Sequence, residues 1–232
     1  MNRIQLKVIC LLVTSGAALN ASNLWNNGAP NTNFGNANPP SDFLSSGVGP
    51  FTVFDSFTVG PTGWLVTGFD ITDFFVNTPT TDYSTGGKTT WSVWNGDPLT
   101  TGQLVMTGSA TGGLTNYSGT CGSSSTCLET ITVGGLNVSL KSGTYYLGTY
   151  NTLASNSDLT YRATSTGRGA GWESSNGAIV GSKFVKGEYP NTSNGGDTAF
   201  DIQGNVAPEP GTMVLMGLAL AGLGYQLRRR SV

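Results

Sequence analysis

Short runs of β-branched and aromatic residues, separated by clusters of turn residues, fill the middle of the chain and restrict what it can fold into. Clear examples are FTVFDSFTV (51–59), TTWSVW (89–94), LETITV (128–133) and GTYYLGTY (143–150). Several of these runs alternate with a period of two, which predicts β-strands with one buried face. Because no amphipathic helix accompanies them, we expect an all-β protein, a two-sheet antiparallel sandwich of the jelly-roll type.

The composition supports a folded, weakly charged domain and removes most routes to catalysis. Charged residues make up only 10% of the 232 residues, whereas there are 34 glycines and five tryptophans. No histidine is present, which excludes Ser-His-Asp and Cys-His triads and zinc sites built on histidine. We expect no enzyme activity, no catalytic residues, no metal and no cofactor.

The N-terminus, MNRIQLKVICLLVTSGAALNAS, has the three parts of a secretory signal. Arg3 and Lys7 supply the positive region, residues 8–13 the apolar stretch, and small residues the cleavage site. We expect cleavage after Ala21, with Ala18 nearly as suitable, so that residues 1–21 form a signal peptide. The alternative is a buried first helix.

The C-terminus combines a short apolar stretch with a basic end. Residues 211–227 are 17 uncharged residues, about 25 Å as a helix, which is at the short limit for a membrane span. Arg228, Arg229 and Arg230 follow directly, and such positive charge stays in the cytoplasm. We therefore expect a single transmembrane helix with the preceding domain outside. The alternative is a C-terminal core helix of that domain.

Pro208, Glu209 and Pro210 stand immediately before this apolar stretch. The order Pro-Glu-Pro, short apolar segment and arginine cluster resembles the PEP-CTERM sorting signal of exported bacterial proteins. A segment of this kind also goes by the name of an ice-binding protein C-terminal domain, which describes the tail and not an activity. The resemblance covers about the last 26 residues, and it implies recognition by an exosortase that cuts near Pro-Glu-Pro.

The same resemblance implies where the protein works and what surrounds it. Proteins of this kind are exported by bacteria that produce exopolysaccharide and form biofilms. They are anchored in the inner membrane during sorting and then reach the cell surface or the extracellular space. The expected partners are thus the exosortase, the membrane and exopolysaccharide.

Nucleic acid is not an expected partner. Between residues 22 and 207 the chain has 12 acidic and 6 basic residues, a net charge of −6, whereas nucleic acid binding needs clustered positive charge.

Four parts of the chain follow from these features. They are the signal peptide at 1–21, a flexible arm or edge strand at 22–50, the β-sandwich ectodomain at 51–204 and the sorting segment at 205–232. We expect the ectodomain to be a non-catalytic structural or adhesive module. The alternative is a carbohydrate-binding, lectin-like domain or a glycoside-active enzyme.

Cys121 and Cys127 flank the polar loop GSSST and are the pair that remains once the signal, with Cys10, is removed. An oxidising compartment favours a disulfide between them, which would constrain the unfolded chain by roughly 2 kcal/mol. Two free thiols in a surface loop are the alternative.

Four aspartates and three tryptophans are the remaining candidates for a binding site. The aspartates form two groups, Asp70 with Asp73 and Asp197 with Asp201, and neither group has the spacing of a catalytic pair on one regular strand. They are most simply turn and edge residues, with a calcium site or a hydrolase as alternatives.

The tryptophans Trp91, Trp94 and Trp172, together with Tyr189, are candidates for an aromatic platform that contacts glycans. Trp91 and Trp94 point to opposite faces of a regular strand, so one is expected in the core and the other partly exposed. Core packing is the main expectation for most of these rings, and a glycan role is the alternative.

Overall fold

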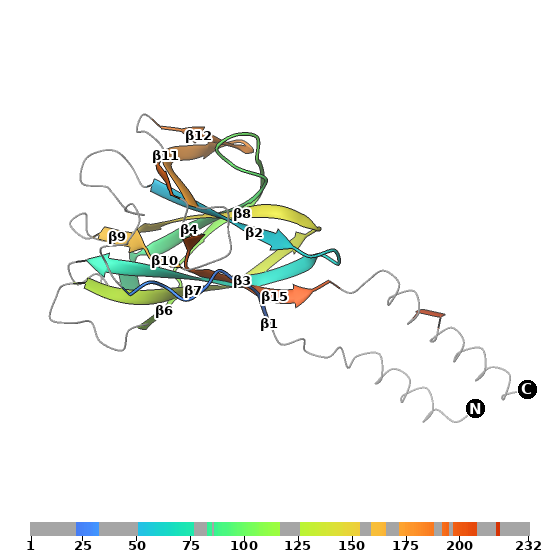
Figure 1. Ribbon diagram of the computed structural model, residues 1–232, viewed down its shortest axis with the longest axis horizontal. Helices are drawn as coiled ribbons and strands as arrows, with labels where there is room; N and C mark the ends of the chain where they lie inside the picture. Colours follow the sequence, from blue (N-terminus) through green and yellow to red (C-terminus); the bar gives the residue numbers. More distant parts are fainter. Residues whose placement is uncertain are drawn as a thin grey trace, which may run out of the picture.

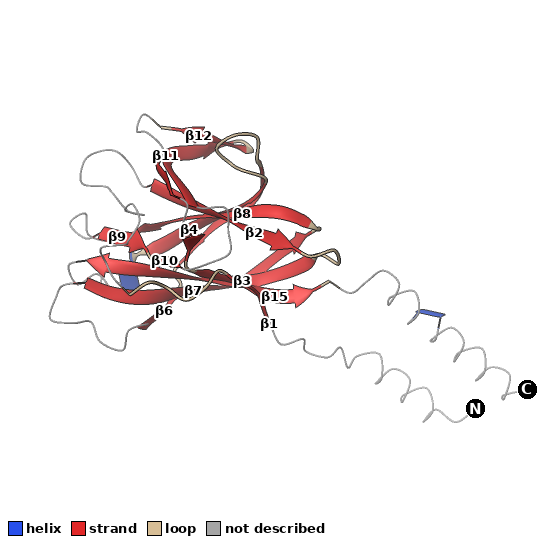
Figure 2. Cartoon of the chain, viewed as in Figure 1, coloured by secondary structure: helices blue, strands red, loops and turns tan. Residues whose placement is uncertain are grey.

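Two antiparallel β-sheets lie face to face in this protein (Figures 1 and 2). The structure is a computed structural model, and it describes residues 22–32, 51–76, 83–84, 86–116, 126–153, 159–165, 172–187, 192–194, 197–207 and 217–218. The predicted all-β, antiparallel fold class is confirmed.

The first sheet has six strands, and its long central strands β3 and β7 pair over most of their length. In order across the sheet they are β1 (Ser22–Asn26), β15 (Phe200–Val206), β3 (Trp64–Val76), β7 (Thr126–Leu140) and β6 (Gly113–Asn116). A further strand, β9 (Leu159–Arg162), pairs with the last residues of β3. β1 thus lies at a sheet edge, while residues 33–50 lie outside the described residues.

The second sheet has seven strands, and a small two-stranded sheet lies beside the first. The order is β12 (Lys183–Lys186), β11 (Trp172–Val180), β2 (Phe51–Val59), β8 (Gly143–Thr152), β4 (Lys88–Asn95) and β5 (Gln103–Ala110), with β13 (Thr192–Asn194) paired to β11. The small sheet consists of β10 (Thr164–Ser165) and β14 (Asp197–Thr198).

The eight principal strands are divided equally between the two sheets. One sheet carries them in the order β1-β15-β3-β7, and the other in the order β2-β8-β4-β5. Successive strands β2, β3 and β4 therefore cross from one layer to the other, as do β7 and β8. This order is that of a jelly roll, in which two Greek keys wrap around one core.

The core fills the space between the sheets with the apolar residues that period-two alternation turns inward. Trp64 stacks on Phe57 with ring centroids 6.1 Å apart, and Phe69 meets the edge of Trp91 at 6.1 Å. The large core side chains on the first sheet include Trp64, Val66, Phe69, Ile71, Phe75, Ile131, Leu140, Phe200 and Ile202. Those on the second include Phe57, Val59, Trp91, Val93, Tyr145 and Leu147.

A β-hairpin covers part of the outer face of the second sheet. The first half of β11 pairs with β2 and its second half pairs with β12. Phe184 of β12 contacts Phe54 and Trp94 at ring-centroid distances of 5.0 and 6.4 Å. At its far end the hairpin reaches β5, where the amide of Leu104 donates to the carbonyl of Ser182. The hairpin therefore buries rings that would otherwise face solvent.

Candidate functional site

The end of β15 is where the described sandwich meets the C-terminal tail. Val206 pairs with Trp64 of β3, and the backbone amide of Ala207 donates a hydrogen bond to the carbonyl of Gly63 at 3.0 Å. Gly63 has a φ of 77°, and a Cβ atom there would lie 2.7 Å from the carbonyl oxygen of Leu140. The turn therefore requires glycine, and the chain is hydrogen-bonded up to the residue before Pro208.

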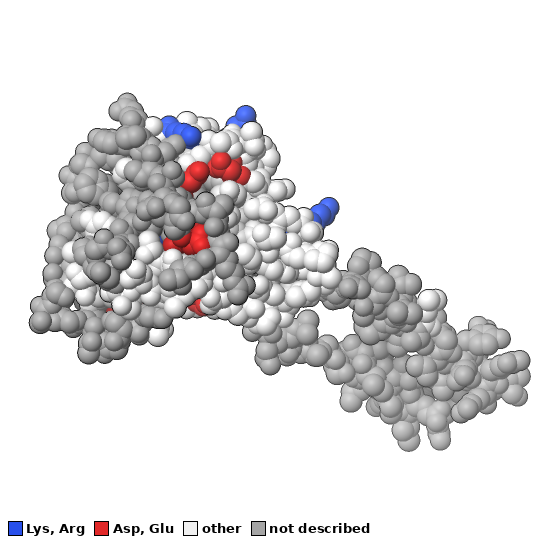
Figure 3. All heavy atoms as spheres, viewed as in Figure 1, with Lys and Arg blue, Asp and Glu red and all other residues white. Residues whose placement is uncertain are grey.

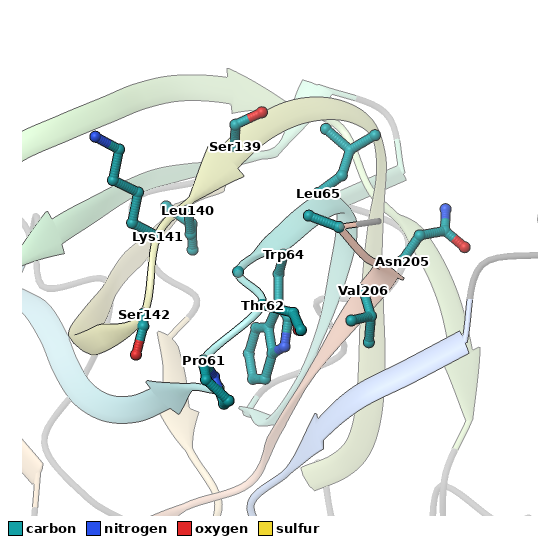
Figure 4. Close-up of a pocket in the computed structure, with 12 residues that line it drawn as sticks. Pro61, Thr62, Trp64, Leu65, Ser139, Leu140, Lys141, Ser142, Asn205 and Val206 are labelled. Carbon is teal, nitrogen blue, oxygen red and sulfur yellow. The ribbon is translucent and has the colours of Figure 1, made fainter. Parts of the chain in front are cut away.

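A mostly apolar pocket of about 730 Å³ lies beside this junction (Figure 4). Its walls are the β2–β3 turn at 61–63, the β7–β8 turn at 140–142 and the last residues of the sandwich at 205–207. The indole of Trp64, only 7% exposed, forms the side toward the core. Among the described lining residues, Lys141 carries the one formal charge.

Comparison with known families identifies this end of the chain. Residues 206–230 match the family model described as the PEP-CTERM protein-sorting motif. The chain carries a PEP-CTERM sorting motif. The match begins at Val206, the last residue of β15, so the PEP-CTERM motif starts where the sandwich ends. No curated protein and no solved structure matches the chain.

The residues predicted for sorting lie almost entirely outside the described part of the chain. This holds for Pro208–Pro210, for the basic residues at 228–230 and for all of 211–227 except Gly217 and Leu218. These two residues are helical, and Leu218 is 63% exposed. Within the described residues, no helix has the length and hydropathy that a membrane crossing requires. The transmembrane segment stays a prediction.

Trp91 and Trp94, two of the three tryptophans proposed for glycan contact, are buried. Trp91 is 4% exposed and lies in the core, whereas Trp94 is 0% exposed and lies under the β11–β12 hairpin. The expectation that one of the two is partly exposed is wrong, because the hairpin covers the second face of β4. The side chain of Trp172 and all of Tyr189 lie outside the described residues.

Cys127 begins the inward-facing row of β7 and is 6% exposed. Cys121 lies outside the described residues. The disulfide between them stays a prediction.

The four aspartates do not lie together in the two groups that the sequence suggests. Asp70 of β3 stands directly across from Asp201 of β15, so one member of each predicted group meets one of the other on the outer face of the first sheet. Asp73 points into the sandwich and is 0% exposed. Asp197 is 4% exposed and lies close enough to raise the pKa of Asp55 by its charge.

Asp73 belongs to a polar network inside the sandwich. Its Oδ1 forms an ion pair with Arg162 and accepts a hydrogen bond from Nε of that residue at 2.5 Å. Its Oδ2 accepts a hydrogen bond from the side-chain amide of Asn151 at 2.5 Å. Arg162, 2% exposed, also donates to Thr149 at 2.5 Å. Glu129 lies opposite Asp73 in the β3–β7 register and is 4% exposed. In the register of the sheet, Asp73 of β3 therefore lies between Arg162 of β9 and Glu129 of β7.

The same network continues to the other sheet. Oδ1 of Asn151 accepts from Thr89 at 2.8 Å, and Thr89 exchanges a hydrogen bond with the hydroxyl of Tyr83 at 2.8 Å. The amide of Gly112 donates to that hydroxyl at 3.1 Å. Burial raises the pKa of Tyr83, so the phenol stays protonated and can act as a donor. These contacts tie β3, β4, β8 and β9 together at one end of the sandwich.

A second buried group surrounds Asp55 of β2. Its Oδ2 accepts hydrogen bonds from the side chain of Asn27 at 3.2 Å and from the amide and hydroxyl of Thr198 at 2.7 and 2.8 Å. Its Oδ1 accepts from the amide of Ser56 at 2.6 Å. Burial, followed by the nearby charge of Asp197, raises the pKa of Asp55 to about 6, against the lowering effect of the hydrogen bonds. Asp55 of β2 is therefore hydrogen-bonded to the segment that follows β1 and to β14.

The alternation of apolar residues in β3 indicates that Asp73 is buried, although the spacing between the aspartates does not. Phe69, Ile71, Asp73 and Phe75 form one period-two row, so Asp73 occupies a core position of β3. A carboxylate at such a position needs a charged or hydrogen-bonding partner. Which partner it meets depends on the pairing of β3 with β9, nearly 90 residues later in the chain.

Proposed function

We propose that this is an exported protein that an exosortase recognises and cuts through the PEP-CTERM motif. In this proposal the β-sandwich then has a structural or adhesive role at the cell surface or in the extracellular matrix. The observation that carries the proposal is the match at residues 206–230, which begins at the last residue of β15. Inner-membrane anchoring by residues 211–227 during sorting is part of the same proposal.

The geometry of the junction is suited to processing near Pro208–Pro210. The last backbone hydrogen bond of the described sandwich is the one from Ala207 to Gly63. Val206 is 51% exposed, and the two prolines that follow cannot continue a strand ladder as donors. A cut after Ala207 therefore removes none of the hydrogen bonds described in the sandwich, and the released domain keeps its fold.

Several observations favour a non-catalytic ectodomain over a glycoside-active enzyme. The chain has no histidine. The buried carboxylate of Asp73 is paired with Arg162 and hydrogen-bonded to Asn151. Asp70 and Asp201 do share a pocket, but no tryptophan is among the described residues that line it. Charged residues make up only 10% of the chain, and they leave most of the described surface uncharged on the face drawn in Figure 3.

A disulfide between Cys121 and Cys127 completes the proposal for the exported state. Cys127 is buried at the start of β7, and an oxidising compartment allows the bond to form. Mass spectrometry under non-reducing conditions tests it through a loss of about 2 Da relative to the reduced chain.

The deciding experiment is the intact mass of the protein from the cell envelope and from the medium. We expect loss of the signal peptide and of everything beyond the Pro208–Pro210 region. In the variant Glu209→Ala the tail is expected to remain, whereas the control Glu173→Ala, in β11, is processed normally. A wild-type protein that keeps Arg228–Arg230 in every fraction would overturn the processing half of the proposal.

A further inference from the structure

A pocket of about 340 Å³ lies on the outer face of the six-stranded sheet, away from the sorting junction. Its floor consists of outward-facing side chains, Asp70 and Thr72 of β3 and Thr130 of β7. Asp201 of β15 stands beside Asp70, and the loop at 26–30 forms the opposite wall. The volume is within the range of pockets that hold small ligands.

The floor of this pocket is held in place by hydrogen bonds below it. Oδ1 of Asp70 accepts from the hydroxyl of Thr132 at 2.5 Å, and Oδ2 accepts from the amide group of Gln203 at 2.5 Å. Thr72, only 6% exposed, exchanges a hydrogen bond with Thr130 at 3.1 Å. The carboxylate is therefore fixed in one orientation before any ligand arrives, which reduces the entropy cost of binding.

The loop wall is also fixed to the sandwich. The amide of Gly28 donates to the side chain of Asn26 at 2.8 Å, and Gly28 has a φ of 94°. The amide of Asn27 donates to the carbonyl of Phe200 at 3.0 Å, and the amide of Asn31 donates to the carbonyl of Thr164 at 2.7 Å. Both ends of the wall are thus bound to other strands, so the pocket is built by the fold.

The chemistry of the pocket selects a ligand that donates hydrogen bonds. Two carboxylates face it, and no lysine or arginine is among the described residues that line it. Burial, and to a smaller extent the charge of Asp70, raises the pKa of Asp201, whereas a hydrogen bond with the side chain of Asn23 lowers it. Anionic ligands are repelled, whereas hydroxyl or ammonium donors form charge-assisted hydrogen bonds to the carboxylates.

A metal ion fits the described residues less well than an organic ligand does. Calcium takes six to eight oxygen ligands, and the described part of the chain has no group of three or more acidic or cysteine side chains that could hold a metal. Thr72 and Thr130 add hydroxyl groups, which serve a ligand that both donates and accepts hydrogen bonds.

We propose that this pocket binds a sugar unit of a polysaccharide, with hydroxyl or ammonium groups of the sugar donating hydrogen bonds to Asp70 and Asp201. The inference gives the adhesive role proposed above a specific ligand. It rests on that proposed function, because only an exported protein comes into contact with extracellular polysaccharide. Its test is a binding assay on purified protein, so it can fail independently of sorting.

The test is isothermal titration calorimetry on the full chain, kept in a detergent without a sugar head group. The probes are cellotetraose, a glucosamine tetramer and a galacturonate tetramer, which are neutral, cationic and anionic. We expect heat of binding with the neutral or the cationic probe and none with the anionic one. Binding of cellotetraose shows that hydroxyl donors suffice, whereas binding of the glucosamine tetramer alone assigns the donor to the ammonium group.

Two variants locate the site, and a third is their control. Asp201→Asn removes one charged acceptor and should weaken binding about tenfold or more. Ala29→Trp fills the pocket from an exposed loop position and should abolish binding without touching the sheet. Asp97→Asn makes the same chemical change in the β4–β5 turn, far along the chain from the pocket, and should bind as the wild type does.

Three results would overturn the proposal. One is the absence of binding to all probes, and another is binding that survives both Asp201→Asn and Ala29→Trp. The third is a calcium titration whose binding is lost in Asp201→Asn while no sugar binds, which would make the pocket a cation site. Cleavage of a bound tetramer, checked by mass spectrometry after the titration, would overturn the binding-only role.

Discussion

Replacing Arg162 by methionine tests whether the buried ion pair with Asp73 holds the polar end of the sandwich together. The substitution keeps an unbranched side chain of similar length but removes the guanidinium, which is 2% exposed. Asp73, which is 0% exposed, then has only Asn151 as a described hydrogen-bond partner, and Thr149 loses its donor. Because Asp73 is buried on the inward face of β3, its carboxylate cannot reach solvent while the two sheets stay packed.

Removing one partner of a buried ion pair costs about 3–5 kcal/mol. For a domain of this size each kcal/mol lowers Tm by about 2–4 °C, so Arg162→Met should lower Tm by about 6–20 °C. The measurement is urea and thermal unfolding of the full chain in mild detergent, followed by tryptophan fluorescence. Lys183→Met, which removes an exposed charge from β12, is the control and should change the free energy of unfolding by less than about 0.5 kcal/mol.

A double-mutant cycle separates the ion pair from the loss of packing. Asp73→Asn combined with Arg162→Met removes both charges, so the double variant should be at least about 2 kcal/mol more stable than the sum of the single effects predicts. A loss below about 1 kcal/mol in Arg162→Met would refute the reasoning. So would strictly additive single effects, since they would mean that the two side chains do not interact across the interior.

Three further predictions concern the outer face of the second sheet and the buried Asp55. Gly148→Ala should destabilise the fold by about 1–3 kcal/mol in urea unfolding, because the new Cβ would overlap the ring of Phe54. Gly113→Ala has open space around the new Cβ and should leave the stability unchanged. Phe184→Ala removes the ring that covers Trp94, so the fluorescence of that indole should shift to longer wavelength; an unchanged spectrum would contradict the covering role of the hairpin. Because the pKa of Asp55 rises from 3.8 to about 6 on folding, the folded state binds more protons between these values. Asp55 therefore contributes about 3 kcal/mol to the free energy of unfolding below pH 3.8, and this contribution is lost as pH rises through 6. Asp55→Asn should reduce this dependence of the free energy of unfolding on pH, measured by urea unfolding at different pH values.

The strands and the fold class could be predicted because period-two patterns are local. The run at 51–59 is β2 and the run at 143–150 lies within β8. The same pattern could not show that Trp94 is buried, since its cover is Phe184, 90 positions later in the sequence. Exposure of an outward-facing ring depends on which distant segment folds over the sheet, and no local alternation carries that information.

The candidate sites also differ in whether local sequence can predict them. The PEP-CTERM motif is contiguous, so residue order alone identified it. The pocket with Asp70 and Asp201 depends on the pairing of β3 with β15, which joins residues 131 positions apart. Spacing within each aspartate group therefore does not predict this pocket, because most strand pairings in this fold join strands that are not consecutive in the sequence.

The position of β15 links the fold to the sorting of the protein. β15 carries the PEP-CTERM motif at its end, and it lies between β1 and β3 with hydrogen bonds on both sides. Ser22 of β1 pairs with Gly204, so the first described residue lies beside the exit of the tail. In the membrane-anchored state proposed above, the tail pulls on a strand that is hydrogen-bonded to a neighbour on each side. Separating β15 breaks its hydrogen bonds to both β1 and β3, so we expect the sandwich to remain folded while its tail is held and cut.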